Sequence, residues 1–329
     1  MENNASLESV KRISILVPTY NEEENVVPLT EAIVAEFAQS LPQYDYDITF
    51  IDNCSTDTTR EKLEEICAAN KKVKAIFNAR NFGQFNSPYY GICQTTGDCT
   101  IVMCADFQDP IEMIPKLVAE WEQGYKVVCA VKETSKENKV MRFLRTCYYK
   151  IIRKMSTVEQ IEHFTGFGLY DCSFVKVMRE LDDPNPFLRG VVAELGYHKK
   201  LLPYEQAARR AGKTHNNFKT LYDAAMQSFT TYTKTPIRML TATGAVTMAG
   251  SCVMGTVALV LSFVSAKNVS YKELQHRLTA LAAVGFFGSL NLLATSLVGE
   301  YLLTLRARVN KRPLVIEERR INFDMAERP

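Results

Sequence analysis

Two stretches without a charged residue, 239–266 and 278–299, constrain the fold of this chain more than any other feature. They are 28 and 22 residues long, and about 20 apolar residues in a helix are enough to cross a bilayer. We therefore expect two transmembrane helices, joined by the short loop 267–277 into a hairpin. A pair of buried core helices is the alternative.

Basic residues indicate how such a hairpin would be oriented. Lys234 and Arg238 precede the first stretch, six Lys or Arg residues follow the second between 306 and 320, and the loop has three. Because cytoplasmic flanks are enriched in Lys and Arg, we expect both termini and the first 230 or so residues in the cytoplasm. This predicts an integral protein of the cytoplasmic (inner) membrane. The N-terminal MENNASLESVKR lacks the apolar core of a secretory signal.

Composition excludes some classes of protein. A hydrophobic content of 47% with 23% charged residues is typical of a globular chain. The net charge of +2 gives no support for a nucleic-acid partner. The nine cysteines are odd in number and form no C-x-x-C pair, so neither a zinc site nor a disulfide framework is indicated. They are typical of a reducing compartment.

The first 135 residues alternate between strand and helix patterns. Short β-rich runs occur at Ile13–Val17, Ile48–Ile51, Lys74–Phe77, Thr100–Cys104 and Val127–Val131. Amphipathic stretches of helical length lie between them at Glu24–Ser40, Thr58–Ala69, Phe85–Thr95 and Glu112–Gln123. This alternation predicts an α/β fold, with a mainly parallel sheet and helices on both faces.

Polar clusters follow the first four predicted strands: PTYNEEE, DNCSTDTT, NARNFGQ and ADFQD. Parallel α/β sheets bind ligands beyond the carboxyl ends of their strands, so four such clusters predict one site. Asp52 ends a strand and could accept a hydrogen bond from a nucleobase or ribose. Asp57 with Thr58 could equally cap the next helix.

The fourth cluster has the oxygen ligands that a hard cation prefers. Asp106 and Gln108 suit Mg²⁺ or Mn²⁺, which hold phosphates while keeping several waters. For Asp109 we favour an N-cap, because Asp-Pro-x-Glu is a common start of a helix. Cys104, two residues before Asp106, is a poor ligand for such a metal.

Taken together, the motifs resemble family 2 glycosyltransferases of the GT-A fold, of the type that acts on polyprenyl phosphates. The resemblance covers nearly the whole chain. Its motifs are VPTYNEEEN (17–25), IDNCSTDTT (51–59), RNFGQ (80–84), ADFQDP (105–110), FLRG (187–190), AGKT (211–214), TPIRML (235–240), VGEYL (298–302) and KRPLVIEE (311–318).

The resemblance implies an inverting transfer of a sugar from a nucleoside diphosphate, UDP being favoured, to polyprenyl (undecaprenyl) phosphate. Asp106 and Gln108 would hold the metal on the diphosphate, and Asp52 would bind the base. The residues implied to contact the donor nucleotide sugar are Pro18, Tyr20, Asn21, Glu22, Asp52, Ser55, Arg80 and Gln84.

The chain departs from the family pattern at three places. Cys104 replaces the first acid of a common Asp-Ala-Asp, which puts metal dependence in doubt. Asn53 replaces a common second Asp of the base pocket. Gly166 and Gly168 stand where many relatives have Asp and Arg, so any role of that pair is in doubt here.

The acceptor itself lowers the chemical demand on the enzyme. A phosphate monoester is largely a dianion at neutral pH, so it needs no general base, only positioning and cations. Lys136–Lys154 has seven basic residues and one acid at amphipathic helical spacing, which suits an anionic membrane surface; a solvated surface helix is the alternative. Arg142, Arg145 and Arg189, with Asp106, are the candidate catalytic residues, and Arg210 is a further candidate.

These inferences divide the chain into four parts. Residues 1–135 form the nucleotide-sugar-binding core, 136–235 the acceptor side of the catalytic domain, 236–305 the two transmembrane helices and 306–329 a basic cytoplasmic tail. The lipid product would serve surface-glycan or lipopolysaccharide modification, and a homo-oligomer is left open. The alternatives are a processive or other-lipid glycosyltransferase, and a non-catalytic membrane partner that keeps the fold.

Overall fold

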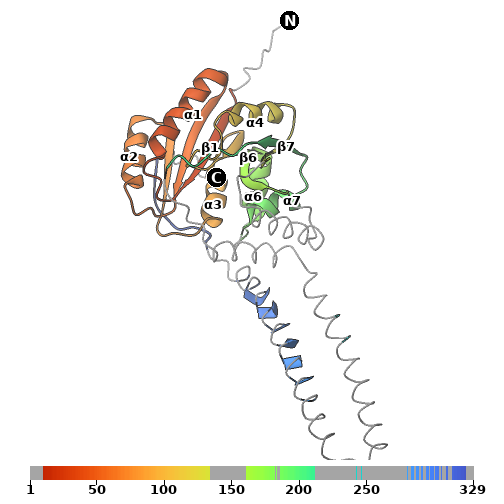
Figure 1. Cartoon of the computed structure of the whole chain (residues 1–329). Coiled ribbons are helices and arrows are strands. Elements are labelled where there is room, and N and C mark those ends of the chain that lie inside the picture. Colours follow the sequence, from red (N-terminus) through yellow and green to blue (C-terminus); the bar gives the residue numbers. More distant parts are fainter. Residues whose placement is uncertain are drawn as a thin grey trace, which may run out of the picture.

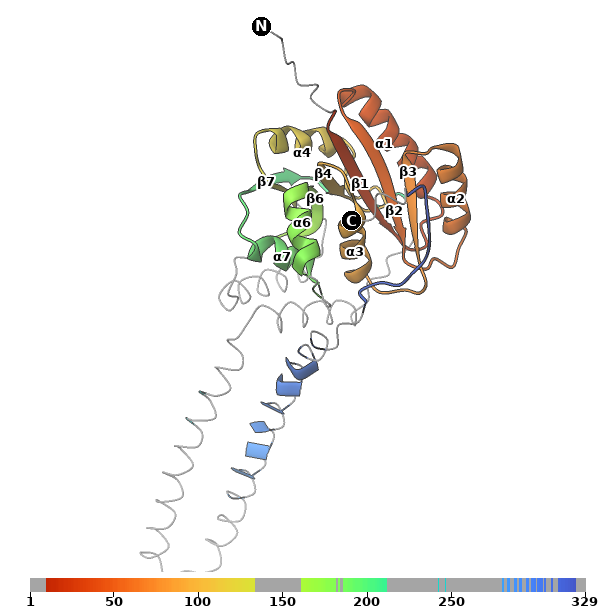
Figure 2. The same ribbon diagram turned by 180° about the vertical axis from the view of Figure 1, so that it is seen from behind.

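The computed structural model describes residues 10–133, 161–211 (apart from 182, 184 and 185) and 313–323, with single residues and short runs between 242 and 309. Figures 1 and 2 show these parts in colour from opposite sides. The predicted basic helix 136–154 lies outside the described residues, and so do Arg142 and Arg145.

One eight-stranded sheet organises the described part of the chain, in the order β7-β5-β6-β4-β1-β2-β3-β8. Strands β4, β1, β2 and β3 run parallel, as do β5 and β7, whereas β6 and β8 are antiparallel to their neighbours. The strands are β1 (Arg12–Thr19), β2 (Asp45–Asp52), β3 (Val73–Asn78), β4 (Cys99–Val102), β5 (Val127–Lys132), β6 (Phe164–Asp171), β7 (Lys199–Tyr204) and β8 (Glu317–Ile321).

Helices cover both faces of the sheet, which confirms the predicted α/β architecture. One face packs against α1 (Val26–Ser40), α2 (Thr59–Ala69) and α4 (Met113–Glu122), and the other against α3 (Asn86–Gln94), α6 (Cys172–Leu181) and α7 (Leu188–Glu194). The four helices expected from sequence differ from the observed ones only at their ends.

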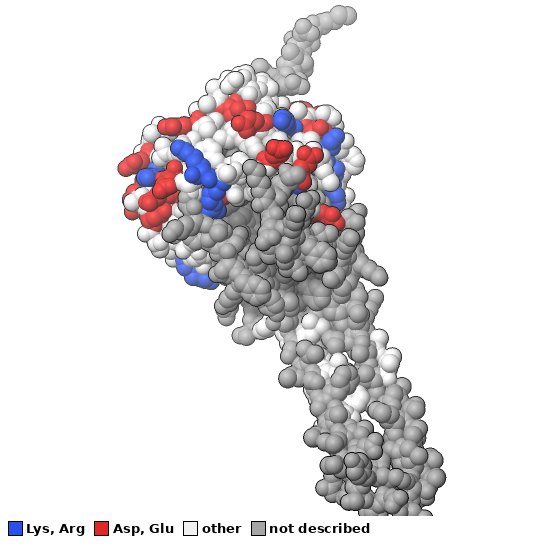
Figure 3. All heavy atoms as spheres, viewed as in Figure 1, with Lys and Arg blue, Asp and Glu red and all other residues white. Residues whose placement is uncertain are grey.

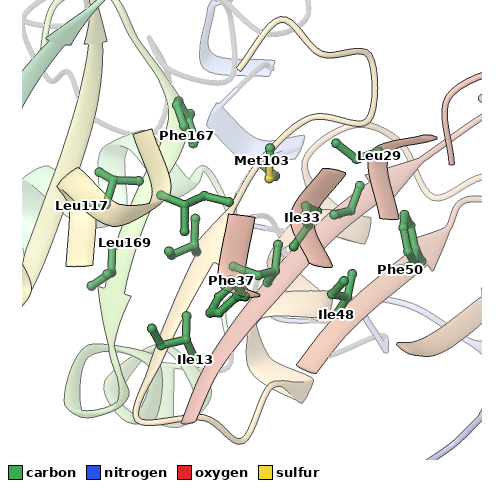
Figure 4. Packing of buried hydrophobic residues seen from close by; sticks show 14 of the residues in the cluster. Ile13, Leu29, Ile33, Phe37, Ile48, Phe50, Met103, Leu117, Phe167 and Leu169 are labelled. Atoms are coloured by element: carbon green, nitrogen blue, oxygen red, sulfur yellow. The ribbon is translucent and has the colours of Figure 1, made fainter. Parts of the chain in front are cut away.

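Helix α1 illustrates how the sequence selects an element and its partner. Leu29, Ile33 and Phe37 recur at the spacing of one helical face, and all are buried on the strands beneath (Figure 4). Each such side chain contributes about 1.5–3 kcal/mol through burial. Pro28 is tolerated because it lies in the first turn, where backbone N–H groups have no partner within the helix.

Strand β8 was not predicted, because it belongs to the expected basic tail. Its residues EERRI are mostly charged and give no strand-like alternation. It pairs antiparallel with β3 and forms the edge of the sheet. Figure 2 shows this C-terminal segment, in blue, passing beside β3 and α2. Residues 313–323 therefore lie on the same side of any membrane as the rest of the sheet.

Among the residues that the structure describes, no helix is both long and apolar enough to cross a membrane. Of the predicted spans, 239–266 lies outside those residues except for 242 and 246, and 278–299 is described only in scattered positions, so the hairpin stays a prediction. On the face of the domain shown in Figure 3, acidic and basic side chains are interspersed. This surface agrees with the small net charge of the chain.

Asp171 closes β6 and joins it to three other groups. Its carboxylate accepts hydrogen bonds from Trp121 Nε1 (2.8 Å), Lys126 Nζ (3.1 Å) and the backbone N–H (3.0 Å) and hydroxyl of Ser173. Burial opposes ionisation of Asp171, but the hydrogen bonds from Ser173, Trp121 and Lys126 outweigh it and hold the pKa below its usual value. The ionised carboxylate therefore stabilises the folded state.

Asp171→Asn is expected to lower the free energy of unfolding at pH 7 by about 1.5–3 kcal/mol. Because the folded pKa is depressed, this contribution is fully present above the unfolded pKa of about 3.9 and is lost as the pH falls through the folded pKa. The fluorescence of Trp121, the chain's single tryptophan, would follow denaturant unfolding at pH 7 and pH 3. The variant should differ from the natural chain at pH 7 and much less at pH 3. Glu31→Gln, on the exposed side of α1, is the control and should behave as the natural chain at both.

Candidate active site

The loops after β1 and β2 are joined at the carboxyl edge of the sheet. Asn21 has a left-handed backbone (φ 56°), and its side-chain oxygen accepts from the Thr56 N–H at 2.8 Å. Its own N–H donates to Ser55 Oγ at 2.9 Å, while the Glu22 N–H donates to Thr59 Oγ1 at 2.9 Å. Asn is among the residues that most readily adopt this backbone conformation. The residues of both loops that are predicted to bind the nucleotide sugar are therefore fixed relative to one another.

Asp52 lies at the end of β2 and is completely buried. One carboxylate oxygen accepts from Ser55 Oγ at 2.5 Å, and the other accepts from the Ser55 N–H at 3.1 Å and from Arg60 Nε at 2.8 Å. Both oxygens are thus held by protein groups. Its contact with a base stays a prediction, and any such contact would be made from a carboxylate already fixed in orientation.

Asn53, noted in the sequence as a departure, organises the third loop. Its amide donates to Asn81 Oδ1 (3.0 Å) and to the Gly83 carbonyl (3.3 Å), and its oxygen accepts from the Phe82 N–H (2.9 Å). A carboxylate could accept but could not donate, so the two donated bonds need the amide. These two donated hydrogen bonds therefore favour asparagine over aspartate at position 53.

Arg80 and Gln84 lie on the exposed surface of this third loop. The Arg80 guanidinium lies 4.1 Å from the ring centre of Phe82. Pro18 and Tyr20 are half-buried at the end of β1. The residues predicted to bind the donor nucleotide sugar thus lie in the last residues of β1 and β2 or in the loops that follow β1, β2 and β3, at one edge of the sheet.

Asp106 lies after β4 with 4% of its surface exposed. Its Oδ1 accepts from the Gln108 N–H at 3.1 Å, and its Oδ2 forms an ion pair with Arg209 Nη2 at 2.8 Å. Its backbone carbonyl accepts from the Arg210 N–H at 3.2 Å. The segment after β7 therefore lies directly on the predicted metal ligand.

Arg209 was missed by sequence analysis, which chose its neighbour Arg210. The only signal was the pair of arginines before AGKT, and spacing alone could not decide between them. The Arg210 guanidinium instead lies 5.2 Å from the ring centre of Phe107. The pKa of Glu22 is raised, mainly by burial. The Asn25 hydrogen bond and the Arg209 charge oppose this shift, and the Asp106 charge adds to it. Glu22, Asp106 and Arg209 are thus electrostatic neighbours.

Asp109 does not cap helix α4, so that prediction is wrong. The N-cap position of α4 is Glu112. The Asp109 carboxylate is buried and accepts from the Cys104 N–H (2.9 Å) and from the Tyr204 hydroxyl (3.0 Å). It joins the end of β4 to the end of β7. Burial raises the pKa of Asp109, and the Cys104 and Tyr204 hydrogen bonds partly offset that effect.

Cys104 stays a neutral thiol in this environment. The nearby carboxylates of Asp109 and Asp106 hold the pKa of the thiol well above its usual value, although the residue is exposed. Metals are bound by the thiolate form. A thiol is a poor ligand for a hard cation, and the observed contact of Cys104 is the hydrogen bond from its backbone N–H to Asp109.

The residues present fit a divalent cation held mainly by the donor. Among the described residues, no three His, Cys, Asp or Glu side chains are placed to hold a metal together. Asp106 supplies a carboxylate at the predicted place, within electrostatic range of Glu22, and Gln108 contacts it through its backbone N–H. A cation there would compete with Arg209 for Oδ2 of Asp106, and phosphate oxygens and water would complete its coordination.

Arg189, in the first turn of α7, is half-buried with its guanidinium 5.6 Å from the Phe187 ring centre. Phe187 in turn packs edge-to-face on Phe85, just after Gln84. Arg189 thus lies beside the third loop, and no contact joins it to Asp106 in the described part of the chain. Its role at the acceptor phosphate stays a prediction.

The sheet and the polar loops at its carboxyl edge define an α/β ligand-binding architecture, and comparison with known proteins supplies the family. The chain belongs to glycosyl transferase family 2, whose model matches residues 14–179. It is a glycosyltransferase. The matched range includes every strand-end loop from β1 to β4, whereas Arg209 and β8 lie beyond it.

Two relatives match almost end to end. The putative glycosyltransferase CsbB of Bacillus subtilis (strain 168) is 29% identical over 317 residues, covering 96% of this chain and 94% of its own. A prophage bactoprenol glucosyl transferase homolog of Escherichia coli (strain K12) is 28% identical, covering 94% and 99%. Among solved structures, the mannosyltransferase PcManGT from Pyrobaculum calidifontis, in complex with GDP-Man and Mn²⁺, is 15% identical with a TM-score of 0.44, covering 92% of this chain and 88% of its own.

Proposed function

We propose that this enzyme transfers a sugar from a nucleoside diphosphate sugar, with UDP favoured, to polyprenyl phosphate at the cytoplasmic face of the membrane. The observation that carries the proposal is the position of Asp106. It is a buried carboxylate beyond β4, beside Glu22 of the first loop and paired with Arg209 of the segment after β7. The bactoprenol glucosyl transferases among its relatives support the lipid acceptor.

Two observations support a membrane location with both ends on one side. Strand β8 returns the chain to the sheet after both uncharged stretches, which requires an even number of crossings if they span. Six large apolar residues between 284 and 309 are at least 49% exposed: Val284, Val298, Leu302, Leu303, Leu305 and Val309. Apolar side chains that gather on a surface mark contact with a membrane or partner.

The proposed reaction is a direct displacement that inverts the anomeric centre. The acceptor phosphate oxygen forms the new bond to the anomeric carbon as the bond to the nucleoside diphosphate breaks. The acceptor arrives as a dianion, so the protein needs to position it and to stabilise the charge that develops on the leaving diphosphate. Asp106 and Gln108 would hold the cation that neutralises this diphosphate, and the cationic Arg209 lies within reach of the same place.

A donor screen tests the proposal. The full chain in detergent is incubated with undecaprenyl phosphate, Mg²⁺ or Mn²⁺, and a panel of UDP- and GDP-sugars, and mass spectrometry detects glycosyl lipid. We expect one productive donor, loss of product with EDTA, and recovery on adding the metal back. Product in EDTA would contradict the metal site. Nucleotide binding without any glycosyl lipid would favour another acceptor.

A further inference from the structure

Arg60, in the first turn of α2, hydrogen-bonds to three different strands through its guanidinium. Its Nε donates to Asp52 Oδ2 at the end of β2 (2.8 Å). Its Nη2 donates to the Asn78 carbonyl at the end of β3 (2.7 Å), and its Nη1 to Glu318 Oε2 of β8 (2.9 Å). Its planar group lies 5.5 Å from the ring centre of Phe77. Such a fork holds its partners in fixed directions, which a lysine cannot do.

Asp52 depends on this arginine because its carboxylate is completely buried. A buried charge is tolerated when it is paired and hydrogen-bonded. Arg60 supplies the opposite charge at 2.8 Å, and Ser55 supplies the remaining hydrogen bonds. The orientation of the Asp52 carboxylate is therefore set by where the Arg60 guanidinium lies.

Glu318 brings the C-terminal segment into this arrangement. Its side chain is 51% exposed, whereas that of Arg60 is 19% exposed. A second ion pair, Arg319 with Glu64, also joins β8 to α2, but it lies on the exposed surface and makes no contact with Asp52 in the described structure. Two ion pairs thus hold β8 to α2. Only the pair formed by Glu318 and Arg60 continues to Asp52, the residue predicted to bind the base.

We propose that Arg60 is a positioning residue, which links the packing of β8 against α2 to the orientation of the Asp52 carboxylate. The C-terminal segment 313–323, which contains β8, thereby sets the affinity for the donor nucleotide. The inference rests on the proposed function, since it takes the nucleotide to bind at the ends of β1 and β2. Glu318 acts through Arg60 and does not touch the nucleotide. The expected effect is on binding of the donor, while the rate of the chemical step is unchanged.

The test measures nucleotide affinity of the full chain in detergent by calorimetry, with UDP and GDP as probes, together with KM and kcat for the productive donor. Arg60→Lys is expected to weaken nucleotide binding about tenfold, as for the loss of a charge-assisted hydrogen bond. Glu318→Gln should weaken it about two- to fivefold, as for a half-exposed ion pair. In both variants KM should rise with kcat within about twofold. Glu64→Gln, which removes the parallel ion pair, should leave both values unchanged.

The double variant distinguishes a relay from two separate effects. Because Glu318 acts through Arg60, Arg60→Lys with Glu318→Gln should bind nucleotide no more weakly than Arg60→Lys alone. Additive losses, equal losses in Glu318→Gln and Glu64→Gln, or a fall in kcat at constant KM would each overturn the inference. If Arg60→Lys fails to fold, the comparison of the two glutamate variants still decides. A natural chain that binds neither nucleotide would refute the proposed function as well. If Asp52→Asn loses binding but Arg60→Lys and Glu318→Gln do not, only the relay is refuted.

Discussion

Asp106→Asn is expected to reduce glycosyl transfer about 100- to 1,000-fold, the loss that follows removal of one group that stabilises a transition-state charge. The substitution keeps the shape of the side chain and an oxygen that can accept the Gln108 N–H, so the loop after β4 should stay in place. It removes the negative charge that would hold a cation against the donor diphosphate. It also removes the ionic partner of Arg209. We therefore expect kcat to fall while the domain remains folded.

The measurement is the rate of glycosyl-lipid formation at saturating donor, with thermal unfolding followed in parallel. Asp98→Asn is a matched control, because Asp98 precedes the same strand at its opposite end, is exposed and accepts the Arg12 N–H. It should turn over at the natural rate. Unchanged turnover in Asp106→Asn would refute the assigned role of this carboxylate. A comparable loss in both variants would point to damage to β4 instead.

Gly168→Ala is expected to lower the free energy of unfolding by about 3 kcal/mol, the upper end of the range for overpacking. Gly168 lies within β6 and pairs with Val102 on one side and Cys129 on the other. A Cβ atom there would overlap the backbone carbonyl oxygen of Val128 and lie 3.3 Å from the Cα of Cys129. These are backbone atoms in the middle of a sheet, so they cannot move aside without breaking the β5–β6 ladder.

Denaturant unfolding followed by Trp121 fluorescence would measure this loss. Gly124→Ala is the control: Gly124 has a positive φ of 100° but nothing within 4 Å of an added Cβ. Only backbone strain should appear there, about 1 kcal/mol. Losses of the same size in the two variants would show that the close approach of β5 to β6 does not matter.

Much of the fold is encoded locally and could be predicted. The runs that became β1 to β5 are apolar and rich in β-formers, and the stretches that became α1 to α4 each have one apolar face. The strand-end clusters followed, because parallel strands bring their carboxyl ends to one edge. Strand β6 escaped prediction because its glycines mimic a loop, and β8 because an edge strand needs few apolar residues.

The amino-acid sequence by itself determined the α/β class, the family, and the carboxylates and amides at the ends of the strands. Only the tertiary structure decided that Arg209 pairs with Asp106, that Asp109 holds Cys104 and Tyr204 together, and that Arg60 joins Asp52 to Glu318. The reason is physical. The periodicity of a sequence indicates whether a side chain faces the core. A charged side chain, however, pairs with whichever segment the sheet places within about 3 Å of it, and that segment can come from anywhere in the chain.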